Sequence, residues 1–481
     1  MNTLIQKAYD PEAFRRYGHE LVDLLAKHLH AVQVEESEPA IPFTSPGEEY
    51  AFWEEDYRNN RKEPPLALFE KVLSRSVRVQ HHRYMGHQIS PAAPLAALAS
   101  LLDGLLNNGM GVYEMGAAGT AIERLVVKTV AAKMGFNENA DGVMTSGGSL
   151  ANLAALLAAR SVKGPGTVWR EGQREKLALM VSEEAHYCVD RAVRIMGWGE
   201  GGIIKVPADG LYRMRVDLLE ECLKKAEAEG KTVIAVVGSA CSTATGSFDN
   251  LEAIAGFCEK HGLWFHVDGA HGGALCFSDK HRHLLAGIER ADSVAMDFHK
   301  MLLTPAVATA LLFRDGQHAF RTFSQKAQYL WERETDEEWH NLAKRTFECT
   351  KLMMGLKAYT LLRTYGPELW QQYLEKVMAS GQQFAALVRE SEGFELPVEP
   401  QCNIVCFRYH PPEVKGDALN ALNEAIRQDL LEEGRFYIVK TSLKNHVFLR
   451  VTLSNPFTTE ADMREVLSAI RTLADTRLGK S

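Results

Sequence analysis

The sequence has 481 residues, of which 46% are hydrophobic and 24% are charged, so it is long enough to bury a large core and has an ordinary globular composition. These proportions exclude a chain that is disordered over most of its length. The formal net charge of −8 gives no indication of a nucleic-acid partner, which would require a basic surface.

No part of the sequence is typical of a membrane span or a secretory leader. The longest apolar runs, residues 94–106 and 304–313, are too short or are interrupted by Asp103, and the first residues lack the basic start and apolar stretch of a signal sequence. The eight cysteines include no CxxC pair, and Cys402 and Cys406 have no second pair that would complete a zinc site. We therefore expect buried free thiols, no metal, no membrane or nucleic-acid partner, and a cytoplasmic location.

The first predicted element is an amino-terminal helical arm. Apolar residues recur at helical spacing over residues 11–32. A connection rich in proline and glutamate follows over residues 35–65. We expect such an arm, residues 1–90, to cover an apolar surface of the same chain or of a second subunit.

From about residue 90, helices alternate with short β-rich runs. Helices are predicted over residues 117–133, 149–160 and 185–196. Buried strands are predicted over residues 177–182, 232–238, 263–268, 293–296 and 306–313. Apolar strands separated by helices indicate a mostly parallel sheet that is covered on both faces. Ligands of such sheets bind at the carboxyl ends of the strands, which predicts that Asp268 faces a ligand.

The last third of the sequence predicts a charged segment, two long helices and a smaller domain. The charged segment spans residues 325–344, and the helices span residues 347–365 and a further stretch through Phe384. Strands over residues 403–409 and 447–453, with a helix over 418–432, indicate an α+β fold. We therefore expect an arm over residues 1–90, a large α/β domain over 91–365 and a small carboxyl-terminal α+β domain over 366–481.

Lys300 is the first candidate catalytic residue, because it lies between two apolar runs in SVAMDFHKMLL. Lysines are seldom buried without a partner. A lysine that forms an imine at neutral pH must lose its proton, and burial with neighbouring positive charge lowers the pKa of such an amine. For Lys300 taken alone, a strand-end lysine that reaches solvent is the simpler interpretation.

Asp268 ends a predicted strand and is followed by the small residues of GAHGG. A carboxylate beside the pyridine ring of pyridoxal phosphate keeps the ring nitrogen protonated, and this protonation makes the ring an electron sink. Small residues after the carboxylate would let a flat ring lie against the backbone. A helix cap or a metal ligand is the alternative interpretation for an isolated aspartate at this position.

Two further polar segments complete a possible site. The turn TSGGS, residues 145–149, opens a helix, so its backbone N–H groups and small residues can bind an anion, although many such turns are simple caps. A nucleotide P-loop is disfavoured because the sequence has no GxxxxGK[ST] motif. A second polar turn, CSTATG, spans residues 241–246. His186 follows a predicted strand and could stack on an aromatic ligand or transfer protons, or could simply be a surface histidine.

Five motifs occur in the order TSGGSLAN, AHYCVDRA, STATGSFD, HVDGAHGGA and DFHKML. Together they resemble the group II pyridoxal-phosphate-dependent amino-acid decarboxylases, and the similarity extends from about Pro91 to the end of the chain. The resemblance implies an α/β fold of the pyridoxal-phosphate-dependent transferase type, fold type I. It also implies the cofactor pyridoxal 5′-phosphate, conversion of an L-amino acid to its amine and carbon dioxide, and a homodimer with shared active sites.

The resemblance implies roles for individual residues. Lys300 would hold the cofactor as a Schiff base, Asp268 would pair with the pyridine nitrogen, and His186 would stack on the ring and take part in catalysis. The other implied cofactor contacts are Gly148 and Ser149 at the phosphate, His299 beside it, Ala270 beneath the ring and Thr243 in the pocket wall. The implied substrate contacts are Tyr113 and Arg450, and a structural role in a strand is the alternative for Arg450.

The sequence departs from the family pattern at two places. Asp297 and Phe298 replace the Asn-Pro pair that precedes His-Lys in most members, as in the diaminobutyrate branch. The loop tyrosine that protonates the product carbon in the family has no counterpart over residues 336–339, and Tyr329 is the nearest candidate. We expect the charged segment, residues 325–344, to act as a lid.

These departures leave other functions open. An aldehyde synthase, a transaminase or a carbon–carbon lyase on the same fold is the first alternative. A non-catalytic cofactor-binding protein is a weaker one, because a scaffold has no use for the complete Lys, Asp and His set. A nucleotide-binding α/β enzyme is weaker still. The substrate is left open, since Tyr113 and Glu114 resemble the glutamate branch whereas Asp297 and Phe298 resemble the diaminobutyrate branch.

Overall fold

The computed structural model describes residues 3–34, 38–60, 62–166, 168–324 and 339–480. The chain divides into two compact units. Unit 1 comprises Met1–His87, Gln383–Pro397 and Cys406–Ser481, and unit 2 comprises Gln88–Gln382 and Val398–Val405. The division into three domains at residues 90 and 365 stays a prediction.

Unit 1 begins with four helices. They are α1 (Leu4–Ala8), α2 (Pro11–Val34), α3 (Pro46–Asn59) and α4 (Pro65–Arg75). Helix α2 confirms the predicted first helix, but α3 occupies a segment that was predicted to be a connection. The reason is local, because Ser45 and Glu48 form a capping box and Pro46 stands in the first turn, where its missing N–H costs no hydrogen bond.

The rest of unit 1 is a small α+β assembly. Strands β8 (Phe394–Glu395), β9 (Ile404–Tyr409), β11 (His446–Thr452) and β10 (Val439–Leu443) form one sheet, in which β8 with β9 and β10 with β11 are antiparallel. Helices α16 (Asp417–Glu433) and α17 (Glu460–Leu478) accompany this sheet. Helix α15 (Glu368–Glu390) belongs to unit 2 as far as Gln382 and to unit 1 from Gln383. These elements confirm the strands and the helix that were predicted for the last hundred residues.

Unit 2 is built around a seven-stranded sheet in the order β1-β7-β6-β5-β4-β2-β3. The strands are β1 (Asp141–Thr145), β2 (Leu177–Ser182), β3 (Ile203–Val206), β4 (Thr232–Ser239), β5 (Trp264–Asp268), β6 (Ser293–Asp297) and β7 (Thr309–Phe313). Strands β2 to β6 pair in parallel, and β7 is antiparallel to both β6 and β1. The mostly parallel sheet is therefore confirmed, and all of its strands except β7 end at the same edge.

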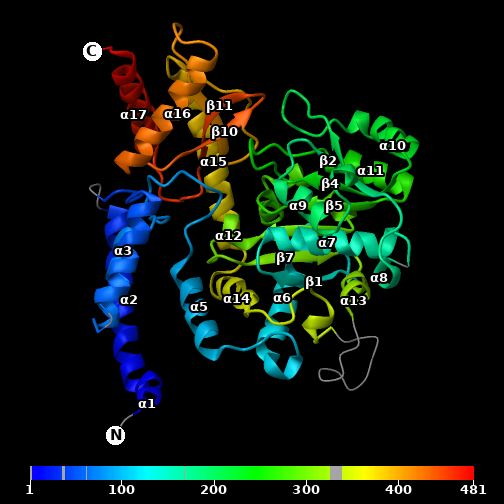
Figure 1. Ribbon diagram of the computed structural model, residues 1–481, viewed down its shortest axis with the longest axis horizontal. Coiled ribbons are helices and arrows are strands. Elements are labelled where there is room, and N and C mark those ends of the chain that lie inside the picture. The colour runs from blue at the N-terminus through cyan, green and yellow to red at the C-terminus, as the bar shows by residue number, and fades with distance from the viewer. Residues whose placement is uncertain (1–2, 35–37, 61, 167, 325–338, 481) are drawn as a thin grey trace. The chain divides into compact units, whose positions relative to one another are not determined.

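Helices cover both faces of this sheet, as the ribbon of unit 2 shows (Figure 1). Ala178 and Met180 of β2 lie in one apolar cluster, and Leu179 and Val181 lie in the other. The first cluster includes residues of α6 (Ala117–Met134), α10 (Leu219–Ala228) and α11 (Leu251–His261), and the second includes residues of α7 (Gly148–Lys163) and α9 (Tyr187–Ile195). Burial on both faces explains why these strands are continuously apolar.

The remaining helices of unit 2 are α5 (Pro94–Leu106), α8 (Val168–Glu171), α12 (Phe298–Met301), α13 (Gln317–Phe323) and α14 (Met354–Tyr365). The prediction of a helix from residue 347 was wrong, because α14 begins seven residues later. Tertiary bonds fix the preceding segment outside a helix. Lys351 Nζ donates to Glu123 at 2.5 Å and to the Met144 carbonyl at 2.6 Å, and the Met353 N–H donates to Asp103.

No helix in the described ranges of the chain combines the length and the apolar character needed to cross a bilayer.

Candidate active site

Five polar segments meet where the parallel strands end. The TSGGS turn follows β1, the segment with His186 follows β2, the CSTATG turn follows β4, Asp268 ends β5, and α12 with Lys300 follows β6. They surround a cavity of about 160 Å³. The cavity is lined by Gly148, Ser149, Asn152, His186, Cys188, Cys241, Thr243, Asp268, Ala270, His271, Asp297 and Lys300. Seven of the ten predicted site residues, Gly148, Ser149, His186, Thr243, Asp268, Ala270 and Lys300, thus lie in one pocket of unit 2.

Lys300 lies in this pocket with a carboxylate as its nearest charged partner. Its Nζ is 3.1 Å from Asp297 Oδ2. Burial lowers the pKa of Lys300, but the negative charges of Asp297 and Asp268 outweigh burial, so the pKa is raised overall. The expectation that neighbouring positive charge lowers this pKa was therefore wrong. The raised pKa favours the ammonium form of Lys300, which pairs with Asp297.

Asp268 is the last residue of β5 and is 8% exposed. Its Oδ1 accepts the N–H of Ala270 at 3.2 Å, and its Oδ2 is 3.9 Å from Cys188 Sγ. The strand end and the turn therefore fix the carboxylate at the cavity wall.

The glycine at 272 has a packing role, because a Cβ there would stand 2.5 Å from the Phe248 ring.

His186 precedes α9 as its N-cap residue. Its Nδ1 accepts the N–H of Cys188 at 3.3 Å, which assigns the proton of a neutral ring to Nε2. Burial lowers the pKa of His186, the Asp268 charge opposes this, and the Lys300 charge adds to it. A neutral imidazole at the cavity wall can lie against an aromatic ring and can donate one hydrogen bond.

The TSGGS turn places the amino terminus of α7 at the cavity. Gly147 has φ +107°, which a residue with a side chain rarely adopts. The first N–H groups of a helix lack carbonyl partners within the helix, so those of Gly148 and Ser149 are suited to an anion. Asn152 steadies this turn, because its Nδ2 donates to the Gly148 carbonyl and its Oδ1 lies 2.8 Å from His266 Nε2.

Three predicted site residues lie elsewhere. His299 is beside the pocket, with Nδ1 3.2 Å from the Ala308 carbonyl oxygen and Nε2 3.8 Å from Asp297 Oδ2. Tyr113 is 43% exposed, its N–H donates to Asn341 Oδ1, and it is not among the residues that line the pocket. Arg450 is a buried residue of β11 in unit 1. Tyr329 and residues 325–338 of the predicted lid lie outside the described residues.

The pocket also contains residues that were not predicted to belong to it. These are Asn152, Cys188, Cys241, His271 and Asp297. Two of them had a signal in the sequence, since Asn152 stands four residues after Gly148 on α7 and Cys188 stands two residues after His186. Asp297 was noticed only as a departure from the family pattern, and its contact with Lys300 needed the structure.

The side chains of this pocket fit pyridoxal 5′-phosphate. An amine, a buried carboxylate, a neutral imidazole and a helix amino terminus match the aldehyde, ring nitrogen, ring face and phosphate of that cofactor. The alanine at 270 adds a small wall residue. One feature opposes the fit, because the Asp297 carboxylate places a negative charge at the amino terminus of α7.

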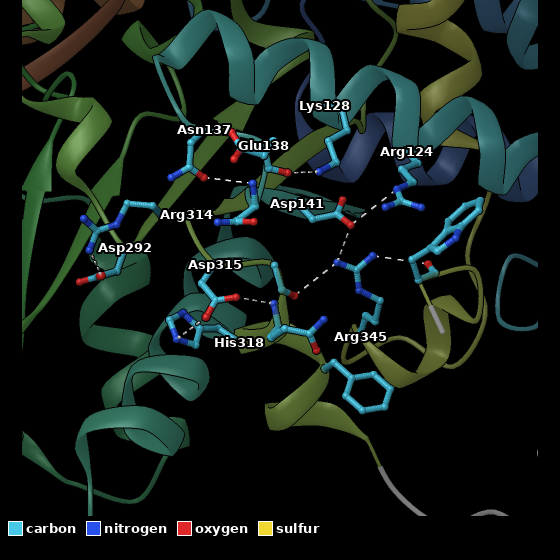
Figure 2. A pocket seen from close by; sticks show the side chains of 15 residues that line it. Arg124, Lys128, Asn137, Glu138, Asp141, Asp292, Arg314, Asp315, His318 and Arg345 are labelled. Atoms are coloured by element: carbon cyan, nitrogen blue, oxygen red, sulfur yellow. Dashed lines mark hydrogen bonds and ion pairs between the residues drawn. The ribbon is translucent and has the colours of Figure 1, made fainter. Parts of the chain in front are cut away.

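A larger cavity, of about 810 Å³, lies at the other end of β6. Figure 2 shows its charged side chains turned toward one another. Arg345 pairs with Asp141 at 3.1 Å, and Arg314 pairs with Asp292 at 2.6 Å. Lys128 donates to the carbonyl groups of Glu138 and Ala140. These charges are therefore satisfied within the wall of the larger cavity.

Comparison with known proteins points to one family. The family model described as "Pyridoxal-dependent decarboxylase conserved domain" matches residues 50–410. Cysteine sulfinic acid decarboxylase of Mus musculus is 30% identical over 480 residues, with 94% of this chain and 96% of that protein covered. L-2,4-diaminobutyrate decarboxylase of Acinetobacter baumannii is 29% identical over 419 residues, with 84% and 82% covered. A crystal structure of mouse CSAD has a TM-score of 0.89 at 27% identity and covers 97% of this chain and 99% of its own.

Proposed function

The chain belongs to the pyridoxal-dependent decarboxylase family, and on that premise we propose that it converts an L-amino acid to its amine and carbon dioxide, with Lys300 holding the cofactor. The observation that carries the proposal is the convergence of Lys300, Asp268, His186 and the α7 amino terminus in one pocket. These groups come from segments far apart in the sequence. A core that needed only packing would have no use for this set of charges.

Different residues of the pocket would contact different parts of the cofactor. Lys300 would hold its aldehyde, the N–H groups of Gly148 and Ser149 would bind its phosphate, and Ala270 and Thr243 would border it. When bound, the cofactor supplies the electron sink for breaking a bond at the α-carbon. Asp268 would keep the ring nitrogen protonated, which is the condition for that sink.

The protein itself contributes orientation, a dry site and protons. His186 is held by the Cys188 N–H, so one face of the ring would meet a fixed, neutral imidazole. Burial of Asp268 and Asp297 strengthens their electrostatic effect on groups in the pocket. The Lys300 amine, once released from the aldehyde by a substrate amine, and the His186 imidazole would be groups of this pocket that hold a proton.

We also propose that Arg450 binds a carboxylate of the substrate, as the family resemblance implies. Arginine suits this role because its planar fork can bind a carboxylate through two hydrogen bonds. We expect Arg450→Met to raise KM with a smaller effect on kcat. Equal losses in kcat and kcat/KM would contradict a role in ground-state binding.

A product assay with a panel of amino acids tests the proposed reaction. The panel should include cysteine sulfinate, glutamate, aspartate, 2,4-diaminobutyrate and the aromatic amino acids, because decarboxylases of the family are named for different substrates. We expect one substrate to give amine and carbon dioxide in equal amounts. Aldehyde with ammonia and peroxide would instead show an aldehyde synthase, and the Lys300→Ala protein is the control for both.

A homodimer in the cytoplasm is the assembly and location that we propose. Helix α5 of unit 2 exposes a row of apolar side chains, namely Leu98, Leu101, Leu102, Leu105 and Leu106, and an apolar face of this kind fits a second copy. All eight cysteines are free thiols, which suits a reducing compartment. Sedimentation equilibrium of the holoenzyme would contradict the dimer if it gave the mass of one chain.

A further inference from the structure

The carboxylate of Asp297 occupies the corner of the pocket where the phosphate of the cofactor would bind. Asp297 ends β6 and is buried, and its oxygens lie 3.2 and 3.3 Å from the point where a Cβ of Gly148 would stand. The carboxylate therefore faces the first residue of α7. The Thr309 hydroxyl donates to Oδ1, and Lys300 Nζ lies 3.1 Å from Oδ2.

The positive charge at this corner is too small to balance both the Asp297 carboxylate and a phosphate monoester. Lys300 supplies one charge, and the amino terminus of a helix is equivalent to about half a charge. Asp297 removes one charge, and a phosphate monoester removes about 1.5 to 2 at pH 7. The sum is about −1 to −1.5, and uptake of one proton brings it to about 0 to −0.5.

The other titratable groups near Asp297 leave this balance unchanged. His299 Nε2 is 3.8 Å from Oδ2, which is within ion-pair distance, so the balance applies at pH values where this imidazole is neutral. Burial lowers the pKa of His186 and raises the pKa of Cys188, so both groups are neutral near pH 7. The charge of Asp268 would be offset by the protonated ring nitrogen of the bound cofactor.

We propose that Asp297 makes cofactor binding proton-coupled, so that the phosphate ester binds together with one proton held between the phosphate and this carboxylate. The inference rests on the proposed function, because it requires the phosphate at the amino terminus of α7. Affinity for the phosphate ester then falls by up to about tenfold per pH unit above about pH 6, where the phosphate takes its second charge. Affinity for the same ring without phosphate lacks this pH dependence, because no phosphate charge is involved.

Pyridoxamine 5′-phosphate and pyridoxamine are suitable probes, because neither carries the aldehyde that reacts with Lys300. Their dissociation constants are measured by titration calorimetry on the cofactor-free, full-length protein between pH 6 and pH 9. The quantity of interest is the Kd of pyridoxamine divided by the Kd of its phosphate ester. We expect this ratio to fall at least about tenfold between pH 7 and pH 9. A ratio that stays level or rises over this range overturns the proposal.

The variant Asp297→Asn removes the charge and keeps the size of the side chain. We expect its ratio at pH 8 to exceed that of the wild type by about tenfold or more, and to change little with pH. Asp292→Asn is the matched control, because Asp292 stands at the opposite end of β6 and pairs with Arg314. A ratio in Asp297→Asn equal to that of the wild type overturns the proposal. The pH profile of the wild type decides the matter should this variant not fold.

The binding data distinguish an error about Asp297 from an error about the proposed function. A phosphate ester that binds more tightly than pyridoxamine at every pH, by a constant factor, contradicts only the role of Asp297. A phosphate ester that binds no better than pyridoxamine at any pH contradicts both, because the α7 amino terminus would then not bind phosphate.

Discussion

The two cavities of unit 2 lie at opposite ends of β6 and differ in how their charges are balanced. In the smaller cavity, Lys300, Asp297 and Asp268 line one space together with the amino terminus of α7, and both carboxylates raise the pKa of Lys300. In the larger cavity, the charged side chains pair locally, as Arg345 does with Asp141 and Arg314 with Asp292. The larger cavity has five times the volume, about 810 Å³ against 160 Å³.

The arrangement of charges therefore indicates the reactive pocket better than the cavity volume does. Ion pairs within the cavity wall affect the free energy of unfolding when they are buried, and have little measurable effect when they are exposed. Charges that converge on an open space are available to a ligand, and their pKa values respond to it. Substitutions in the two cavities should therefore have opposite effects on activity and on stability.

The largest effect is expected for Lys300→Ala in the small pocket. Loss of the amine removes the group that would hold the cofactor, so we expect kcat to fall at least about a thousandfold. The visible absorbance of the bound cofactor should disappear with it. Carbon dioxide release and the absorbance spectrum measure the two effects, and a variant with full turnover would refute the assignment of Lys300.

A smaller loss is expected for Asp268→Asn. The amide cannot keep the ring nitrogen protonated, so the electron sink weakens, and we expect kcat to fall about 10²- to 10³-fold with the cofactor still attached. Single-turnover decarboxylation of the loaded enzyme measures this step. An unchanged rate with normal cofactor content would exclude Asp268 as the partner of the ring nitrogen.

For the larger cavity we expect Arg345→Ala to affect stability and leave catalysis intact. The Arg345 side chain is 5% exposed, and its loss leaves the buried Asp141 carboxylate with Arg124 at 3.8 Å. We expect the free energy of unfolding to fall by about 3 kcal/mol. Urea denaturation of the cofactor-free protein measures the change, and a large loss of kcat in the folded variant would indicate that this cavity takes part in the reaction.

The smallest effect is expected for Arg314→Ala. The Arg314 side chain is 43% exposed, and exposed ion pairs contribute about 0 to 1 kcal/mol to the free energy of unfolding. We expect neither stability nor kcat to change beyond that amount. If Arg314→Ala lowered the free energy of unfolding more than Arg345→Ala does, burial would not determine which ion pair of this cavity stabilises the fold more.

The sequence was sufficient for the elements and the residues that depend on local patterns. Strand β2 was predicted at residues 177–182 and is found there, because a short apolar run between two helices fits a strand that is buried on both faces. Asp268 and His186 could be predicted because Asp268 ends a strand and His186 comes four residues after the end of another.

The sequence was not sufficient where contacts between distant segments decide the outcome. The late start of α14 depends on Lys351 reaching Glu123. The raised pKa of Lys300 depends on the distance to Asp297, and the opposite shift was predicted because no pattern reveals a distance. Helix α3 is a different case, since Ser45, Pro46 and Glu48 are a helix-start signal in the sequence, and a proline in the first turn is compatible with a helix.

Lys300 is the amine to which we propose that the cofactor is attached. Treatment of the holoenzyme with borohydride makes such an attachment permanent, and digestion followed by mass spectrometry then locates the labelled lysine. We expect the label on the peptide that contains Lys300 and no label in the Lys300→Ala protein. A label on another lysine, or the same label in both proteins, would contradict the account.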